Sequence, residues 1–238
     1  HGSGFTTWAK NSHGLKQEVL CFVPDCDPVK VVRLRLSNPS DQPRRITASY
    51  YAHWLLGAVE SAARPHVISR YDTELKAIVG RNLWNAEFAA RAAFLTASRD
   101  PHSVTGDRAA FIGREGDVHN PVGLRHWDLG GQFHQGGDAC AVYQVHLDIP
   151  AGGQEEVVFV LGEVENPTSL AAMVDKWRKP ETTAHAFEAL QDTWAKRLGA
   201  VQVKTPDPSF DLMVNRWLPY QNLSCRILAR AGFYQAGG

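Results

Sequence analysis

Hydrophobic and polar residues alternate along much of the first two-thirds of the chain. In "VVRLRLSN", Val32, Leu34 and Leu36 fall on one side, and Arg33 and Arg35 fall on the other. Successive side chains of a β-strand point to opposite faces, so this run predicts a strand with one buried face. Similar runs, separated by Pro, Gly, Asn and Asp, recur as far as residue 149 and favour an antiparallel β domain.

Two longer runs repeat the pattern. The run "ITASYYAHWLL" predicts a long strand with one face made by Ile46, Ala48, Tyr50, Ala52 and Trp54. The run "AVYQVHLDI" predicts an apolar face made by Ala141, Tyr143, Val145, Leu147 and Ile149. Because the turn "PAGGQ" joins this run to "EEVVFVLGEV", we expect the last two strands to form a hairpin. A single sheet of this size would leave an apolar face in water, so we expect a large sandwich of two stacked sheets.

The segment between residues 81 and 137 is less regular and is rich in Gly, His, Asn and Arg. It predicts long loops with a few strands, such as "AAFLTAS". Long loops on a rigid sandwich are where ligand contacts usually lie.

After residue 166 the hydrophobic period becomes helical. The stretch "PTSLAAMVDKWRK" predicts a helix that Thr168 or Ser169 caps and Pro180 ends. Its apolar side comprises Leu170, Met173, Val174 and Trp177. The stretch "ETTAHAFEALQDTWAKRLG" predicts a second helix that ends at Gly199. Its apolar stripe comprises Phe187, Leu190, Trp194 and Leu198.

A third helix is predicted to start at Asp207 and Pro208, a cap and first-turn pair, and to be kinked or interrupted at Pro219. It is apolar on nearly every side, through Phe210, Leu212, Met213, Val214, Trp217, Leu218, Tyr220, Leu223, Ile227 and Leu228. Such a helix requires partners, so we expect it to begin a helical domain that continues beyond Gly238. Its apolar surface also favours self-association, as in a homodimer.

Charge and composition exclude several classes of partner. The 25 Lys and Arg residues equal the 25 Asp and Glu residues, so no net field attracts nucleic acid or an anionic membrane. No apolar run approaches the roughly 18 residues that span a bilayer, and the first residues do not resemble a signal peptide. Four cysteines are too few for a disulfide scaffold, which favours a reducing, cytoplasmic compartment.

Metal and nucleophile motifs are weak. Cys21 and Cys26 in "CFVPDCDP" lack the spacing of a zinc knuckle, and the ten histidines are scattered, so we predict no metal site. Ser224 and Cys225 lie in an apolar helical stretch, where core packing is the better interpretation than nucleophilic catalysis.

The stretch "TGDRAAFIGREG" is the best candidate for a binding loop. Phe111 and Ile112 can anchor it while Asp107, Arg108 and Arg114 project. An anchored arginine can donate two hydrogen bonds to vicinal sugar hydroxyls or to a phosphate. The alternative is a surface pair between Asp107 and either arginine, worth under ~1 kcal/mol, and spacing alone favours that alternative.

Aromatic residues lie close to this loop in sequence. Trp84 and Phe88 occur in "RNLWNAEF", and an indole can stack on a sugar ring as well as in a core. Core packing is the favoured use of Trp84 from the sequence alone, and Trp84 is kept as a candidate sugar contact beside Arg108.

Four stretches carry a resemblance to a known family. They are "HGLKQEVLCFVPDCDPVKVVRLRLSNPSDQPRRI", "LWNAEFAARAAF", "TGDRAAFIGR" and "NRWLPYQNLSCRILARAGFYQAGG". Together they resemble the phosphorylase domain of cyclic β-1,2-glucan synthases, within the wider family of inverting cellobiose-type phosphorylases, glycoside hydrolase family 94. The resemblance extends from about His13 to the last residue, and the tail is its most specific part.

The resemblance implies a fold that agrees with the hydrophobic pattern. Residues 1–165 would form a β super-sandwich, incomplete at its N-terminus, and residues 166–205 would form a helical linker. Residues 206–238 would begin an α/α barrel. By the resemblance, the barrel carries the catalytic acid and an Arg-Asp pair that grips the non-reducing glucosyl unit, and both would lie beyond Gly238.

The resemblance also implies a chemistry. Inorganic phosphate is the nucleophile and co-substrate, so one protonated carboxyl suffices and no second carboxylate base or cofactor is needed. Arg108 would contact the acceptor-side sugar of a β-linked glucan, with Asp107 orienting it and Arg114 as a weaker candidate. Tyr234 and Gln235 would line the mouth of the barrel. A synthase would further imply glycosyltransferase and inner-membrane segments in the parent protein.

Three functions remain open from the sequence. The first is a catalytically silent N-terminal part of a β-1,2-glucan phosphorylase-type enzyme. The second is an independent carbohydrate-binding sandwich with a helical oligomerisation segment. The third is a purely structural domain that binds no sugar.

Overall fold

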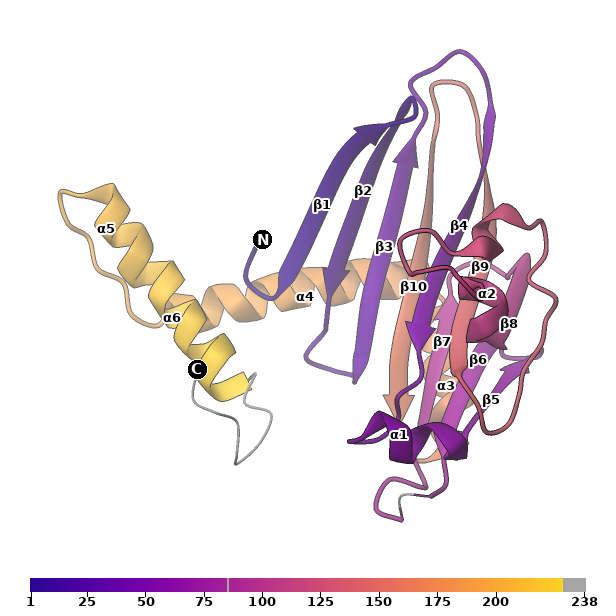
Figure 1. The fold of residues 1–238 in the computed structure, drawn as a ribbon. Coiled ribbons are helices and arrows are strands. Elements are labelled where there is room, and N and C mark those ends of the chain that lie inside the picture. Colours follow the sequence, from indigo (N-terminus) through magenta and orange to yellow (C-terminus); the bar gives the residue numbers. More distant parts are fainter. Residues whose placement is uncertain (85, 229–238) are drawn as a thin grey trace.

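The computed structural model describes residues 1–84 and 86–228, which contain ten strands in two antiparallel sheets (Figure 1). The larger sheet has the order β1 (Phe5–Ser12), β2 (Leu15–Phe22), β3 (Val29–Ser37), β10 (Gln154–Val164), β7 (Ala92–Ala97), β6 (Ala77–Asn82) and β5 (Val67–Asp72). The smaller sheet has the order β4 (Arg44–His53), β9 (Ala139–Ile149) and β8 (Ser103–Asp107). The expected β sandwich is confirmed.

The main core lies between the two sheets, and the alternation of the sequence supplies it. Residues predicted to face inward from three strands belong to this core: Val32, Leu34, Leu36, Ile46, Ala48, Tyr50, Ala141, Tyr143, Val145, Leu147 and Ile149. Trp54, which directly follows β4, joins them and is 5% exposed. Period-two patterning therefore indicated correctly which side chains of these three strands face the core between the sheets.

The predicted hairpin between β9 and β10 is wrong. β9 pairs with β4 and β8 in the smaller sheet, whereas β10 pairs with β3 and β7 in the larger one. The turn at residues 150–153 thus carries the chain from one sheet to the other. Both strands are buried on both faces over part of their length, and alternation alone does not identify the neighbour of such a strand.

Helices cover the outer face of the larger sheet and form a second core. These are α3 (Leu170–Trp177) and α4 (Pro180–Gly199), and their buried residues include Leu170, Val174, Trp177, Leu190, Trp194 and Leu198, as predicted. A 3-10 turn, Pro167–Ser169, precedes α3. Ser169 holds the N-cap position of α3, as expected, but its side chain makes no capping hydrogen bond to the helix. The Asn166 side chain caps the 3-10 turn by accepting a hydrogen bond from the Thr168 backbone amide at 3.0 Å.

The third helical segment starts as predicted, because the Asp207 side chain accepts a hydrogen bond from the backbone N–H of Ser209 at 2.9 Å. It runs through α5 (Pro208–Leu212), a π-helical turn (Met213–Trp217), α6 (Leu218–Gln221) and a second π-helical stretch (Asn222–Leu228). The hydrogen-bond pattern therefore changes on either side of Pro219 while the chain stays helical.

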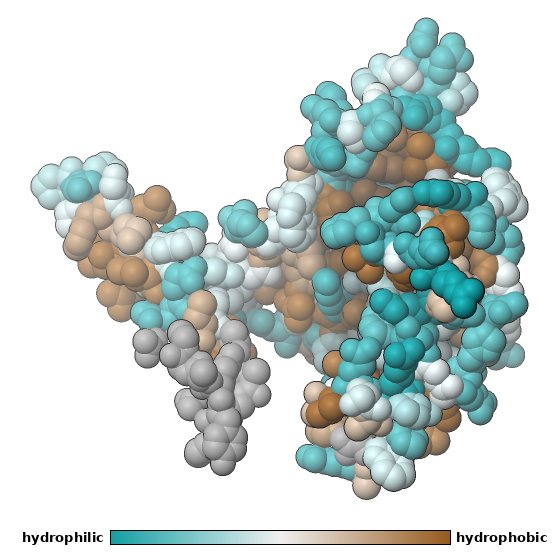
Figure 2. Space-filling model, in the orientation of Figure 1, coloured by the Kyte–Doolittle hydropathy of each residue, from teal (hydrophilic) through white to brown (hydrophobic). Residues whose placement is uncertain are grey.

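Much of this segment's apolar surface is exposed, as expected. Figure 2 shows hydrophobic residues gathered along it, and its exposed side chains are Phe210, Leu212, Met213, Trp217, Leu218, Ile227 and Leu228. Tyr220 and Leu223 instead pack against the second core. Within the described residues, no helix has the length and hydropathy needed to cross a bilayer.

Short helices lie in the connections between strands. α1 (Glu60–Ala63) and a 3-10 helix (Arg64–His66) follow β4, while α2 (Arg108–Ile112) follows β8, and a second 3-10 helix spans Val122–Arg125. The segment "DRAAFIG", expected as a loop, is thus helical where it leaves the sheet.

Candidate functional site

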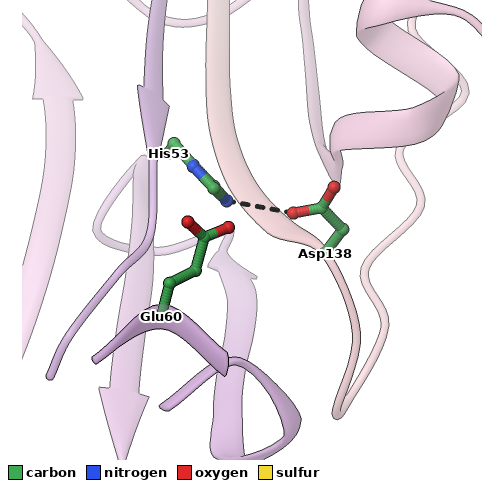
Figure 3. Close-up of side chains that lie close together, drawn as sticks. All are labelled: His53, Glu60 and Asp138. Carbon is green, nitrogen blue, oxygen red and sulfur yellow. Dashed lines mark hydrogen bonds and ion pairs between the residues drawn. The ribbon is translucent and has the colours of Figure 1, made fainter. Parts of the chain in front are cut away.

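Charged residues from several elements meet at one edge of the smaller sheet. Because β9 runs antiparallel to both its neighbours, the last residues of β4 and β8, His53 and Asp107, lie beside the first residues of β9. Asp138 directly precedes β9 and projects there. α1 brings Glu60 to the same edge (Figure 3). The adjoining 3-10 helix brings Arg64 there, where it contacts Asp138.

Arg108 is held at this edge by two hydrogen bonds. Its Nε donates to the Tyr51 hydroxyl at 2.9 Å, and its Nη1 donates to Asp138 Oδ2 at 2.8 Å. Phe111 and Ile112 are 3% and 5% exposed, so they anchor α2 as predicted. The bond to Asp138, followed by the bond to Tyr51, raises the pKa of Arg108. The Arg108 side chain is 33% exposed, so it is held in place and still partly accessible.

Asp138 is the centre of this ion-pair network. His53 Nε2 lies 3.0 Å from its Oδ1, and Arg64 Nη2 lies 3.4 Å from its Oδ2. Burial by itself would raise the pKa of Asp138, but the hydrogen bond and charge of Arg108, with Arg64 and His53, outweigh it and lower that pKa. The carboxylate therefore stays ionised at neutral pH.

Asp107 has a different role from the one expected. It caps α2 by accepting a hydrogen bond from the Ala110 backbone amide at 3.0 Å, and it lies 3.2 Å from His134 Nε2. Asp138 and Tyr51 orient Arg108 in its place. Within the described part of the chain, neither surface pair weighed from the sequence forms.

No contact in the described structure tests the other three candidates, Arg114, Tyr234 and Gln235. Arg114 is exposed and makes no hydrogen bond or ion pair with any residue that the structure describes. Tyr234 and Gln235 lie outside the described residues.

Trp84 is 69% exposed, so the expectation that it packs in the core is wrong. Its indole stacks on the imidazole of His66, with ring centroids 4.4 Å apart and planes 7° apart. The two rings border a shallow pocket of about 400 Å³ that is also lined by Pro65, Ile68, Leu83, Gln135 and Gly136.

A second pocket of about 370 Å³ is lined by the segment after β4, the end of β6, the loop that follows it, and one residue each of β7 and β10. Phe88 and Arg91 line it, with the Arg91 guanidinium 5.6 Å from the centroid of the Phe88 ring. Arg91 also pairs with Glu163 at 2.5 Å, so its charge is already compensated.

His53, Glu60 and Asp138 form a group of possible metal-ligand atoms within 4.8 Å of one another (Figure 3). The carboxylate of Asp138 already contacts Arg108, Arg64 and His53, so a divalent cation would have to displace a guanidinium. We therefore assign His53 and Asp138 to the ion-pair network, with Glu60 close by.

Sequence reasoning missed Tyr51, His53, Arg64 and Asp138. A signal did exist for the first two, because both lie on the outward-facing side of the alternating run that forms β4. No local sequence pattern identifies Arg64 or Asp138. Their positions at the site depend on the register of the sheet and on the paths of the loops that carry them.

Two family models match the chain. The supersandwich domain of glycosyl hydrolase 94 matches residues 1–180, and the catalytic domain of the glycosyl hydrolase 94 superfamily matches residues 193–238. The first range covers all ten strands and α3. The second covers the last turns of α4, from residue 193, and the third helical segment.

Three curated relatives are similar to the chain. Cyclic beta-(1,2)-glucan synthase NdvB of Rhizobium meliloti is 36% identical over 100% of this chain and 8% of its own length. N,N'-diacetylchitobiose phosphorylase of Vibrio furnissii is 26% identical over 100% of this chain and 30% of its own length. Cellobionic acid phosphorylase of Neurospora crassa is 24% identical over 90% of this chain and 27% of its own length. The chain thus spans less than a third of each relative.

Proposed function

The chain belongs to glycosyl hydrolase family 94, and on that premise we propose that it is the sugar-binding and scaffolding part of a β-1,2-glucan phosphorylase-type enzyme. Its parent would carry out inverting phosphorolysis or control glucan chain length. The 36% identity to a protein named cyclic beta-(1,2)-glucan synthase supports the linkage, and the two relatives named as phosphorylases support the reaction class.

The observation that carries the proposal is the fixed guanidinium of Arg108. An arginine has five N–H donors, and Tyr51 and Asp138 use one each, so three remain for the hydroxyls of an acceptor-side glucosyl unit. Because both partners already hold the side chain, little further rotamer freedom is lost when sugar binds. Arg114, Tyr234 and Gln235 stay proposals for further contacts.

Binding of β-1,2-linked gluco-oligosaccharides tests this role. Isothermal titration with wild type and Arg108→Lys should show weaker binding by the variant, because an ammonium cannot bond Tyr51, Asp138 and a sugar in the same fork geometry. Arg216→Lys is the matched control, since Arg216 is exposed on the third helical segment and makes no ion pair among the described residues. Equal affinity of all three proteins would refute the assignment of Arg108.

We propose that residues 1–238 do not catalyse phosphorolysis alone. The proton donor of an inverting phosphorylase must be a protonated carboxyl, with inorganic phosphate as nucleophile and no further cofactor. Asp138, the carboxyl that contacts Arg108, has a lowered pKa and is unsuited to that task. Assays of glucose 1-phosphate release from β-1,2-oligoglucans and phosphate should show no turnover, and turnover by this chain would refute the proposal.

A second candidate is an independent carbohydrate-binding sandwich that oligomerises through residues 208–228. The exposed apolar side chains of that segment favour it. Analytical ultracentrifugation should then show a dimer that Leu212→Glu dissociates, whereas a monomer at all concentrations would exclude a homodimer through this segment. In either case we propose a cytoplasmic location without nucleic-acid or membrane contact by this segment, in keeping with its four free cysteines and balanced charge.

A further inference from the structure

We infer that the pocket beside Trp84 and His66 is a second sugar subsite, which binds another glucosyl unit of the β-linked glucan held at Arg108. The inference deepens the proposed function and rests on it for the identity of the ligand. It begins from a large indole that is 69% exposed and borders a pocket. An exposed aromatic ring beside a pocket is a common element of ligand sites.

The position of Trp84 is built into the fold. Asn82, at the end of β6, is 6% exposed. Its side-chain oxygen accepts a hydrogen bond from the Trp84 backbone amide at 3.0 Å, and its Nδ2 donates to the Leu56 carbonyl at 2.9 Å. A buried side chain thus fixes the backbone that presents the indole, so the ring is preorganised.

One face of the indole is supported and the rest of the ring is accessible. The His66 imidazole lies nearly parallel to it, at 4.4 Å between centroids, and restricts its rotation. A β-linked glucosyl ring has an apolar C–H face and hydroxyls around its rim, so it can lie against a flat aromatic surface while its hydroxyls bond to neighbouring polar groups.

The lining of the pocket indicates a neutral ligand. His66 is its one titratable residue, and the other polar groups of its side chains are the exposed amide of Gln135 and the indole N–H of Trp84. Neither a carboxylate nor a guanidinium lines it, so it offers no strong partner to a phosphate, a nucleotide or a cation. Gly136 has a φ of +66°, and a Cβ there would lie 2.7 Å from the Pro65 carbonyl oxygen, so glycine permits the two pocket segments to approach.

Two chain segments each contribute residues to both the pocket and the Arg108 site. In the 3-10 helix after β4, Arg64 contacts Asp138 while His66, two residues later, stacks on Trp84. In the other segment, Gln135 lines the pocket and Asp138, three residues later, holds Arg108. Two or three residues span at most about 7–11 Å. Neighbouring glucosyl units of one glucan can therefore contact both the pocket and the Arg108 site.

The test uses β-1,2-linked glucose oligomers of two to five units, titrated by NMR against the tryptophan indole N–H signals. Trp84→Ala should identify the Trp84 signal and weaken binding of the longer oligomers about tenfold or more. Trp84→Phe should retain part of the affinity, because a ring remains. Trp127→Ala is the matched control, since Trp127 is 67% exposed, stacks near His102 and His146, and lies outside the pocket.

The outcomes separate this inference from the proposed function. If Arg108→Lys weakens binding and Trp84→Ala leaves it unchanged in a folded protein, the subsite is refuted and the role of Arg108 stands. If Trp84→Ala weakens binding and Arg108→Lys does not, the subsite stands and the role of Arg108 is refuted. Equal loss in Trp84→Ala and Trp127→Ala overturns the subsite, and no binding of any oligomer at tens of millimolar overturns both.

Discussion

Replacing Asp138 with asparagine removes the negative charge that organises the proposed site. The Asp138 side chain is 18% exposed, so water can replace only part of the hydrogen bonding that the carboxylate provides. It holds Arg108 at 2.8 Å and His53 at 3.0 Å, while Arg64 contributes a longer, half-exposed contact at 3.4 Å. A hydrogen bond to a charged group contributes about 1.5–3 kcal/mol, and asparagine retains one carbonyl acceptor.

We therefore expect Asp138→Asn to lower the free energy of unfolding by about 2 kcal/mol at pH 7. For a chain of this size that corresponds to a fall in Tm of about 4–8 °C. Urea denaturation and calorimetry measure both quantities. Asp192→Asn is the control, because Asp192 is exposed on α4 without an ion pair among the described residues, and its effect should stay within about 0.5 kcal/mol.

The pH dependence provides a second check on the same variant. The pKa of Asp138 is lower in the folded protein than its ordinary value of 3.8. A carboxyl of this kind stabilises the fold fully above its ordinary pKa, and this stabilisation is lost as the pH falls through the lowered value. The difference between wild type and Asp138→Asn should therefore be complete at pH 7 and shrink below pH 3.8. Equal stability at pH 7, or a difference that persists at lower pH, would refute the network.

Three further predictions concern other parts of the fold. Trp177→Ala should cost about 3–5 kcal/mol of unfolding free energy by urea denaturation, because Trp177 is 0% exposed and its indole N–H donates to Asp27 at 2.9 Å. Iodoacetamide at pH 8 should alkylate exposed Cys225 and spare Cys140, whose pKa burial raises to about 12, as mass spectrometry can show. NMR titration should place the pKa of His146 below 6.5, because burial and a neighbouring imidazole disfavour its charged form.

Local sequence patterns were enough to predict the longer strands, the helices α3 and α4, and the buried face of each of these two helices. Alternation showed that Tyr143 and Val145 face the core, and helical spacing placed Trp177 and Trp194 against the larger sheet. Strand pairing could not be derived in this way. A strand buried on both faces, such as β9, fits beside several neighbours, and only the packing of the whole sandwich selects β4 and β8.

The candidate site was predictable in part. The anchored arginine of α2 was identified from its own stretch of sequence, whereas its partner Asp138 lies 30 residues away and depends on sheet register. Asp107 was assigned to Arg108 because it is adjacent, but an aspartate before a helix satisfies free backbone amides first. Trp84 was assigned to the core by residue type, and its exposure follows from a turn that Asn82 fixes.

The central claim is that the edge of the smaller sheet binds glucan through Arg108. A crystal structure of the protein with a β-1,2-linked glucose trisaccharide tests it most directly. We predict sugar hydroxyls within hydrogen-bond distance of the Arg108 donors that Tyr51 and Asp138 leave free, and a neighbouring glucosyl ring lying on Trp84. A trisaccharide bound on another face of the sandwich, with the Arg108 guanidinium free of sugar, would contradict the account.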